Sequence, residues 1–168
     1  MLKLIKKFFK AMNNDSNPSE IAGGAVLGVI LGLTPFFALH NLLVIFLLFI
    51  LKVNGAAAVV TTAIFGLIGY LIDPLSHMIG ESILTAGFLE KFWTYLYNIP
   101  LIPFARLNNT VILGSLLISI ILAPFLFILT RKFVVYYRAS LREKVDKLRI
   151  MKILKASKIF KLYMRLSR

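Results

Sequence analysis

The sequence predicts an all-α, polytopic integral membrane protein with two broken or re-entrant helical elements and basic amphipathic helices at its ends. This prediction rests on a long apolar region over residues 21–130, two polar-proline steps inside it, and basic residues concentrated outside it. We call Thr34-Pro35 the first proline step and Asp73-Pro74 the second. With 59% hydrophobic residues and a mean hydropathy of +0.85, the chain is more apolar than a soluble domain.

Charge is distributed unevenly along the 168 residues. The net charge of +13 divides into +3 over residues 1–18 (four Lys, one Asp), −1 over residues 19–130 (three basic, four acidic) and +11 over residues 131–168 (thirteen basic, two acidic). Basic flanks stay on the cytoplasmic side. We therefore expect an even number of crossings of a bacterial inner membrane, with both termini in the cytoplasm.

The same distribution divides the chain into three parts. Residues 1–16 place apolar side chains at helical spacing among lysines, which predicts a helix lying on the cytoplasmic surface rather than a signal peptide. Residues 17–130 form the membrane domain, and residues 131–168 form a basic amphipathic tail. Anionic lipid headgroups are the expected partners of this tail, rather than nucleic acid, because it follows a membrane segment directly.

The first proline step is expected to separate two short helices. A capping box at residues 17–20 (Asn-Pro-Ser-Glu) starts a helix over residues 21–33, whose ~20 Å length is less than the ~30 Å hydrocarbon core. Thr34 and Pro35 then resemble the N-cap and first residue of a helix over residues 36–51. The pair suits a re-entrant hairpin, and one long kinked span is the alternative.

The second proline step is expected to end the next helix. Residues 56–72 are long enough to span a membrane, and a half-length helix follows over residues 75–89. Residues 90–109 combine two prolines with aromatic residues typical of a membrane interface, so we expect a loop there. Residues 110–130, which carry no charge, form the second complete span.

The two proline steps could belong to an inverted structural repeat. Each follows a Gly-rich helix and precedes a helix with an early His, although the spacing is three from Gly32 to Pro35 and five from Gly69 to Pro74. In transporters built from such repeats, the substrate site lies where the broken helices meet.

We predict a substrate-binding site at the first proline step from Thr34, Pro35, His40 and Asn41. The free N–H groups of a helix N-terminus attract anions, so Thr34 would suit the phosphate of a lipid. In the alternative interpretation this is an ordinary cap near the surface, and His40 is a packing residue.

Asp73, His77 and Glu81 stand at i, i+4 and i+8 and are candidates for proton or cation coupling. Ionisable groups inside a membrane are costly and suggest function, and neutral His can carry protons. The alternative is a helix at the interface with all three side chains solvated. The spacing is too long for one small metal ion without a bend, and we expect no metal or other cofactor.

A row of glycines, Gly24, Gly28 and Gly32, gives the first membrane helix a flat face. Such a face lets another backbone approach closely. Helix packing within the chain is the favoured interpretation, and a homodimer built on a glycine zipper is the alternative. Nothing in the sequence indicates an enzyme, because it has no Cys, no Ser/His/Asp pattern, no nucleotide-binding glycine loop and no HExxH motif.

Residues 17–90 resemble the bacterial domain-of-unknown-function family 2062. The matching residues are Pro18-Ser19-Glu20, the glycine row, Thr34-Pro35, His40 and Asn54. Asp73-Pro74 resembles that family's later Asn-Pro step, with Asp in place of Asn, which leaves any anion role of that step in doubt. The resemblance implies a small inner-membrane protein. Some members are joined to glycosyltransferase domains that use polyprenyl-phosphate lipids, which implies a lipid-phosphate partner.

Together these features predict a small transporter or flippase-like protein that handles an anionic, polyprenyl-phosphate-type lipid with proton coupling. One alternative is a scaffold protein whose basic tail binds anionic lipid or a protein partner. Another is a membrane anchor for a lipid-linked glycosyltransferase.

Overall fold

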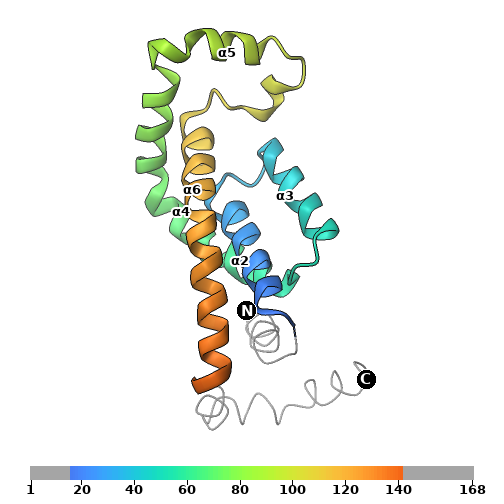
Figure 1. Cartoon of the computed structure of the whole chain (residues 1–168). Coiled ribbons are helices and arrows are strands. Elements are labelled where there is room, and N and C mark those ends of the chain that lie inside the picture. The colour runs from blue at the N-terminus through green and yellow to red at the C-terminus, as the bar shows by residue number, and fades with distance from the viewer. Residues whose placement is uncertain (1–15, 142–168) are drawn as a thin grey trace.

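The computed structural model describes residues 16–141, and all regular structure in that range is helical (Figure 1). The all-α prediction is therefore confirmed. The predicted surface helix over residues 1–16 and most of the predicted tail helix lie outside the described residues. The elements are α2 (Pro18–Leu33), α3 (Leu39–Ile50), α4 (Gly55–Leu84), α5 (Glu90–Tyr97) and α6 (Thr110–Tyr136), with short turns η1 (Gly87–Leu89), η2 (Ile102–Ala105) and η3 (Tyr137–Leu141).

The first two helices, α2 and α3, form a hairpin. The Asn17 side chain caps α2 by accepting a hydrogen bond from the Ser19 N–H at 3.0 Å, and α2 ends at Leu33, both as predicted. After α3 the chain returns to the beginning of α2, where the Asn54 N–H donates to the Glu20 carbonyl at 2.9 Å. One long kinked span, the alternative considered for this region, is thereby excluded.

The prediction that Thr34 caps the helix after it was wrong. Thr34 is the C-cap of α2, and its N–H donates to the Ile30 carbonyl at 3.2 Å. A proline disfavours helical geometry in the residue before it, and Thr34 is extended, with φ −94° and ψ 149°. A turn follows, and α3 begins only at Leu39, with no side chain capping it.

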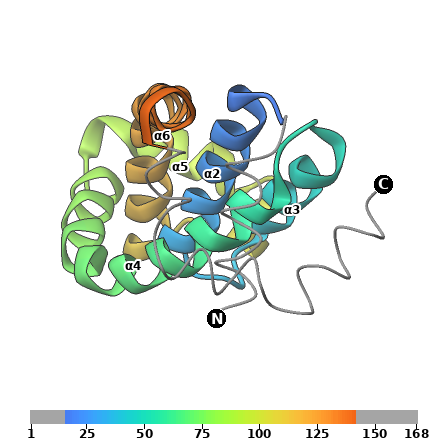
Figure 2. The same cartoon turned by 90° about the horizontal axis from the view of Figure 1, so that it is seen from below.

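The prediction that the second proline step ends a helix was also wrong. α4 runs through it without interruption for 30 residues, with Pro74 inside. Proline removes one hydrogen bond of a helix and bends it without always ending it, and α4 changes direction partway along its length (Figure 1, Figure 2). The two proline steps thus have different local structures, so at this point the two segments do not match as copies of a repeat.

The first part of α4 packs closely against α2 through the glycine row. A Cβ atom added at Gly24 would collide with the backbone of Asn54, and one at Gly28 with the backbone of Ala58. At Gly32 it would lie 2.8 Å from the Thr62 carbonyl oxygen. The face is therefore occupied by another helix of the same chain, and small residues are what such close backbone contact requires.

The second part of α4 packs against the beginning of α6 by the same device. A Cβ atom at Gly80 would collide with the Thr110 backbone, and one at Gly114 with the Ser76 backbone. Asn109 caps α6 by accepting from the Ile112 N–H at 3.0 Å. α4 therefore packs against both α2 and α6, and α2 also packs directly against α6.

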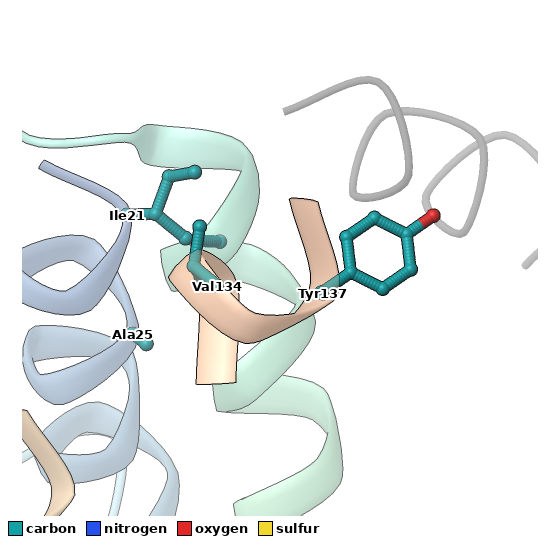
Figure 3. Packing of buried hydrophobic residues seen from close by; sticks show 5 residues of the cluster. Ile21, Ala25, Val134 and Tyr137 are labelled. Carbon is teal, nitrogen blue, oxygen red and sulfur yellow. The ribbon is translucent and has the colours of Figure 1, made fainter. Parts of the chain in front are cut away.

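The two ends of the described chain lie at the same end of the molecule. Ile21 of α2 and Val134 of α6 are fully buried in one cluster, where Figure 3 shows them side by side. The Arg138 guanidinium donates to the Ser16 carbonyl at 2.9 Å. α6 also continues past residue 130, the predicted end of the span, to Tyr136.

The aromatic segment between α4 and α6 is only partly the loop that we expected. Glu90–Tyr97 form the helix α5, and the turns begin after it, near the two prolines. The Trp93 indole N–H donates to the Ile83 carbonyl at 3.3 Å, which connects α5 to the last turn of α4. This end of the molecule lies opposite the end at which α2 begins and α6 ends (Figure 1).

Candidate functional site

The two proline steps meet at one open cavity of about 360 Å³. The end of α2 and the turn after it supply one wall, residues 31–36. The first part of α4 supplies the other wall, with Thr62, Gly66, Gly69, Tyr70 and Asp73. α2 ends before it reaches the level at which α6 begins (Figure 1). The cavity at the end of α2 therefore lies between the two ends of the molecule.

The turn at the first proline step is held by Asn41. This side chain is 1% exposed, and its amide donates to the carbonyls of Pro35 and Phe36 at 2.9 and 3.2 Å. Thr34, 4% exposed, places its hydroxyl 2.9 Å from the Asn41 side-chain oxygen and 2.7 Å from the Ile30 carbonyl. The hydrogen-bonding groups of Asn41 and Thr34 thus have partners within the turn, where they fix its shape.

Both walls of the cavity include a residue whose backbone carbonyl lacks a helical N–H donor. An α-helix pairs the carbonyl of residue i with the N–H of residue i+4, and proline has no N–H to donate. α2 ends at Leu33, so the carbonyls of its last residues, Leu31 among them, have no such donor, and Pro74 inside α4 deprives the Tyr70 carbonyl of one. Leu31 and Tyr70 both line the cavity.

Two further features make the cavity electronegative. It lies at the C-terminal end of α2, which carries the negative end of the helix dipole. Asp73 is its one formally charged lining residue, and within residues 16–141 the Asp73 carboxylate has no ion pair or side-chain hydrogen bond. The arrangement can attract positive charge, and it offers no helix N-terminus to an anion.

The structure separates Asp73 from the other two candidate coupling residues, His77 and Glu81. Asp73 lines the cavity, whereas the His77 Nδ1 atom lies 2.6 Å from the Thr110 hydroxyl of α6. The His77 Nε2 atom lies 3.7 Å from a Glu81 carboxylate oxygen, and both side chains are more than half exposed. No hydrogen bond or ion pair joins Asp73 to His77 within the described chain.

Comparison with known proteins identifies the family. The model of the family described as "Uncharacterized protein conserved in bacteria (DUF2062)" matches residues 2–143. The chain belongs to this family. An uncharacterized protein of Treponema pallidum (strain Nichols) is 26% identical over 145 residues, which cover 86% of this chain and 90% of that relative. No solved structure matches.

The match to the DUF2062 family confirms the resemblance read from the residues and extends it. That resemblance covered residues 17–90, whereas the family match also includes α5 and α6. Both proline steps, the cavity between them and the packing of α4 on α6 lie within the matched region.

His40 stands apart from the cavity. It is not a lining residue, and both of its ring nitrogens are shielded from solvent without a hydrogen-bond partner among the residues described. The described part of the chain also holds no group of three or more His, Cys, Asp or Glu residues that could bind a metal ion.

Sequence reasoning missed the α4 wall of the cavity except for Asp73. Thr62, Gly66, Gly69 and Asp73 are separated by four, three and four residues, which is the spacing of one face of a helix. This signal was visible in the sequence. These four residues form a single face only if the helix is continuous through residue 73. Because the second proline step predicts the end of a helix there, the sequence alone does not group them.

Proposed function

We propose that this member of the DUF2062 family is an integral protein of the bacterial inner membrane. α4 and α6 are long and apolar enough to cross a membrane, and the most apolar 18-residue stretches of these helices are only 17% and 28% buried. The core helix of a soluble protein would be mostly buried. Large apolar side chains such as Phe37, Leu71 and Phe88 are more than 80% exposed, and lipid is the solvent that suits such a surface.

The proposed orientation has both ends of the described chain on the cytoplasmic side. Ser16 and Arg138 are in contact, so the chain enters and leaves the domain at one end. The segments beyond them carry most of the positive charge of the protein, and basic flanks stay in the cytoplasm.

We further propose that the protein is a small transporter-like protein whose substrate site is the cavity between the proline steps. The observation that carries this proposal is that two steps 39 positions apart in the sequence line a single open cavity. Non-helical backbone at membrane depth is tolerated where it lines a cavity or is buried in protein. Transporters commonly form their sites at such points.

Proton coupling remains part of this proposal, with Asp73 in the cavity and the His77–Glu81 pair on the next turns of α4. We expect transport to depend on pH, and this dependence to be lost in Asp73→Asn and in His77→Ala. Flux into proteoliposomes at several pH values measures it. An unchanged pH dependence in both variants would refute the proton role.

An anionic lipid finds better support at the end of α6 than at Thr34. A phosphate at Thr34 would need a helix N-terminus, whereas α2 ends there. Arg131 and Lys132, together with Tyr136, line an open groove of about 540 Å³ near the end of α6. Basic residues just beyond a span bind anionic headgroups. A scaffold function based on lipid binding would use this groove and the basic segment that follows.

The transport proposal is tested by access to the cavity from the two sides of the membrane. The chain has no Cys, so single-cysteine variants have no background labelling. Gly66 lines the cavity, and a Cβ atom there would meet only the Gly32 carbonyl oxygen, at 3.9 Å. Gly87 is a matched control, because a Cβ atom there meets nothing within 4 Å.

Intact cells and inside-out vesicles are treated separately with a membrane-impermeant maleimide. We expect the Gly66→Cys variant to be labelled from both sides, because a transporter opens its site to each side in turn. The Gly87→Cys variant should be labelled from one side only. Labelling of the Gly66→Cys variant from one side alone, or from neither, would contradict transport.

A further inference from the structure

We infer that the cavity between the proline steps binds an organic ammonium group. This inference rests on the proposed function only in taking the cavity as the substrate site. It names the class of ligand, and it differs from the anionic lipid that the sequence suggested.

The backbone supplies the first reason. The end of α2 leaves the Leu31 carbonyl without a helical N–H donor, Pro74 does the same for the Tyr70 carbonyl, and both residues belong to the cavity wall. A freed carbonyl in apolar surroundings needs a donor, because an unpaired polar group there is costly. An ammonium group carries several N–H or polarised C–H donors and can satisfy more than one oxygen.

Charge supplies the second reason. Asp73 is the single formally charged group of the cavity, no Lys or Arg lines it, and the dipole of α2 adds partial negative charge. A lone carboxylate within a membrane segment is expensive and normally pairs with another group. No such partner exists among the described residues, so a bound cation is the group that completes the pair.

Size and lining distinguish an organic cation from a metal ion. A volume of about 360 Å³ greatly exceeds the ~30 Å³ that one water occupies in the liquid. The residues described contain no cluster of metal-binding side chains. The aromatic rings of Phe36 and Tyr70 line the cavity and are largely exposed, and such rings attract ammonium groups through their faces.

The full-length protein in maltoside micelles provides the test, with tetramethylammonium and ethylammonium chlorides as probes in calorimetric titration. We expect at least one of these probes to bind. Asp73→Asn should weaken binding by about tenfold or more, because it removes the charge and keeps the shape. Glu90→Gln is the matched control, since it removes a carboxylate at the start of α5, outside the cavity, and should leave binding unchanged.

A second variant guards against misfolding of the first. Tyr70→Leu keeps an apolar side chain on the exposed wall and should weaken binding by about two- to fivefold through loss of the ring. Inorganic phosphate, titrated in the same way, should not bind at this site. Tighter binding of phosphate than of either amine, or amine binding that Asp73→Asn leaves unchanged, would overturn the inference.

The ammonium group could belong to a free amine or to an aminolipid headgroup. Native mass spectrometry of protein taken from bilayers with equal phosphatidylethanolamine and phosphatidylglycerol separates these sources. Asp73-dependent retention of phosphatidylethanolamine assigns the site to a lipid, and Asp73-dependent binding of the free probes alone assigns it to a soluble amine. If neither depends on Asp73, the inference is wrong.

The failure of this inference and the failure of transport give different results. A cavity labelled from both sides that binds no amine would leave the transporter proposal intact and refute the ammonium site. A cavity that binds amine through Asp73 but is labelled from one side only would do the reverse.

Discussion

Each proline step pairs a residue able to cap a helix with a proline, and the two steps have opposite outcomes. At the first, α2 ends, and the chain turns into a hairpin. At the second, α4 continues through Pro74 and only bends. A proline preceded by a residue able to cap a helix therefore does not decide by itself whether a helix stops.

The difference lies in whether a side chain holds the backbone beside the proline. At the first step Asn41, six residues beyond Pro35, donates to the carbonyls of Pro35 and Phe36, so a non-helical turn costs little. The described structure has no comparable side chain at the second step. There the helical hydrogen bonds on both sides of Pro74 are the best available partners, and close packing through Gly80 and Gly114 holds the second part of α4 against α6.

The largest expected effect is at Asn41. Asn41→Ala should lower the free energy of unfolding by about 2–4 kcal/mol, because it removes three hydrogen bonds inside the turn at once. Unfolding by sodium dodecyl sulfate in mixed micelles measures this. Asn98→Ala, at an exposed position after α5, is the control and should change stability by less than about 0.5 kcal/mol. Equal effects of the two variants would mean that Asn41 does not hold the turn.

Replacing each of the two prolines by alanine should change the stability of the protein in opposite directions. Pro74→Ala should stabilise the protein by about 1–2 kcal/mol, part of the ~3 kcal/mol that proline costs in a helix interior, the rest being offset by packing adapted to the bend. Pro35→Ala should destabilise it by about 0.4–1 kcal/mol, because the unfolded chain gains freedom. The same unfolding experiment compares them, and changes of the same sign would remove the distinction between the two steps.

The smallest expected effects on stability are those of two glycine substitutions, one on each wall of the cavity. Gly32→Ala should destabilise by about 1 kcal/mol, because its Cβ atom would lie 2.8 Å from the Thr62 carbonyl oxygen and overpacking is costly. Gly66→Ala should instead stabilise by about 0.5–1 kcal/mol, because glycine is unfavourable inside a helix and the space is open. Thermal unfolding of both variants measures the pair. A loss of stability in Gly66→Ala would mean that α2 and α4 are closer there than the structure indicates.

Sequence reasoning predicted what local signals determine. The capping by Asn17 and the end of α2 at Leu33 both follow from residues within a few positions of each feature. Continuity at Pro74 could not be predicted in this way. Asn41 stabilises a turn at the first step and has no counterpart at the second in the described structure. At the second step, the helix is held by contacts between α4 and α6, which are distant in sequence.

The candidate site was predicted in parts. Thr34, Pro35 and Asp73 were each selected, and the sequence left open whether they meet. They do meet in the cavity, but the electrostatics at Thr34 are reversed, because the helix there ends and does not begin. Identifying which end of a helix lies beside a proline therefore mattered more than identifying the proline.

Because Ser16 contacts Arg138, the chain enters and leaves the helical core at neighbouring positions. A domain fused before α2 and a domain fused after α6 would start from neighbouring positions and work on the same side of the helical core. Closely placed chain ends are also what circular permutation requires. Joining the two ends of the described helical core by a short linker, and opening the chain in the turns between α5 and α6, would preserve the helix contacts while moving both new termini to the opposite end.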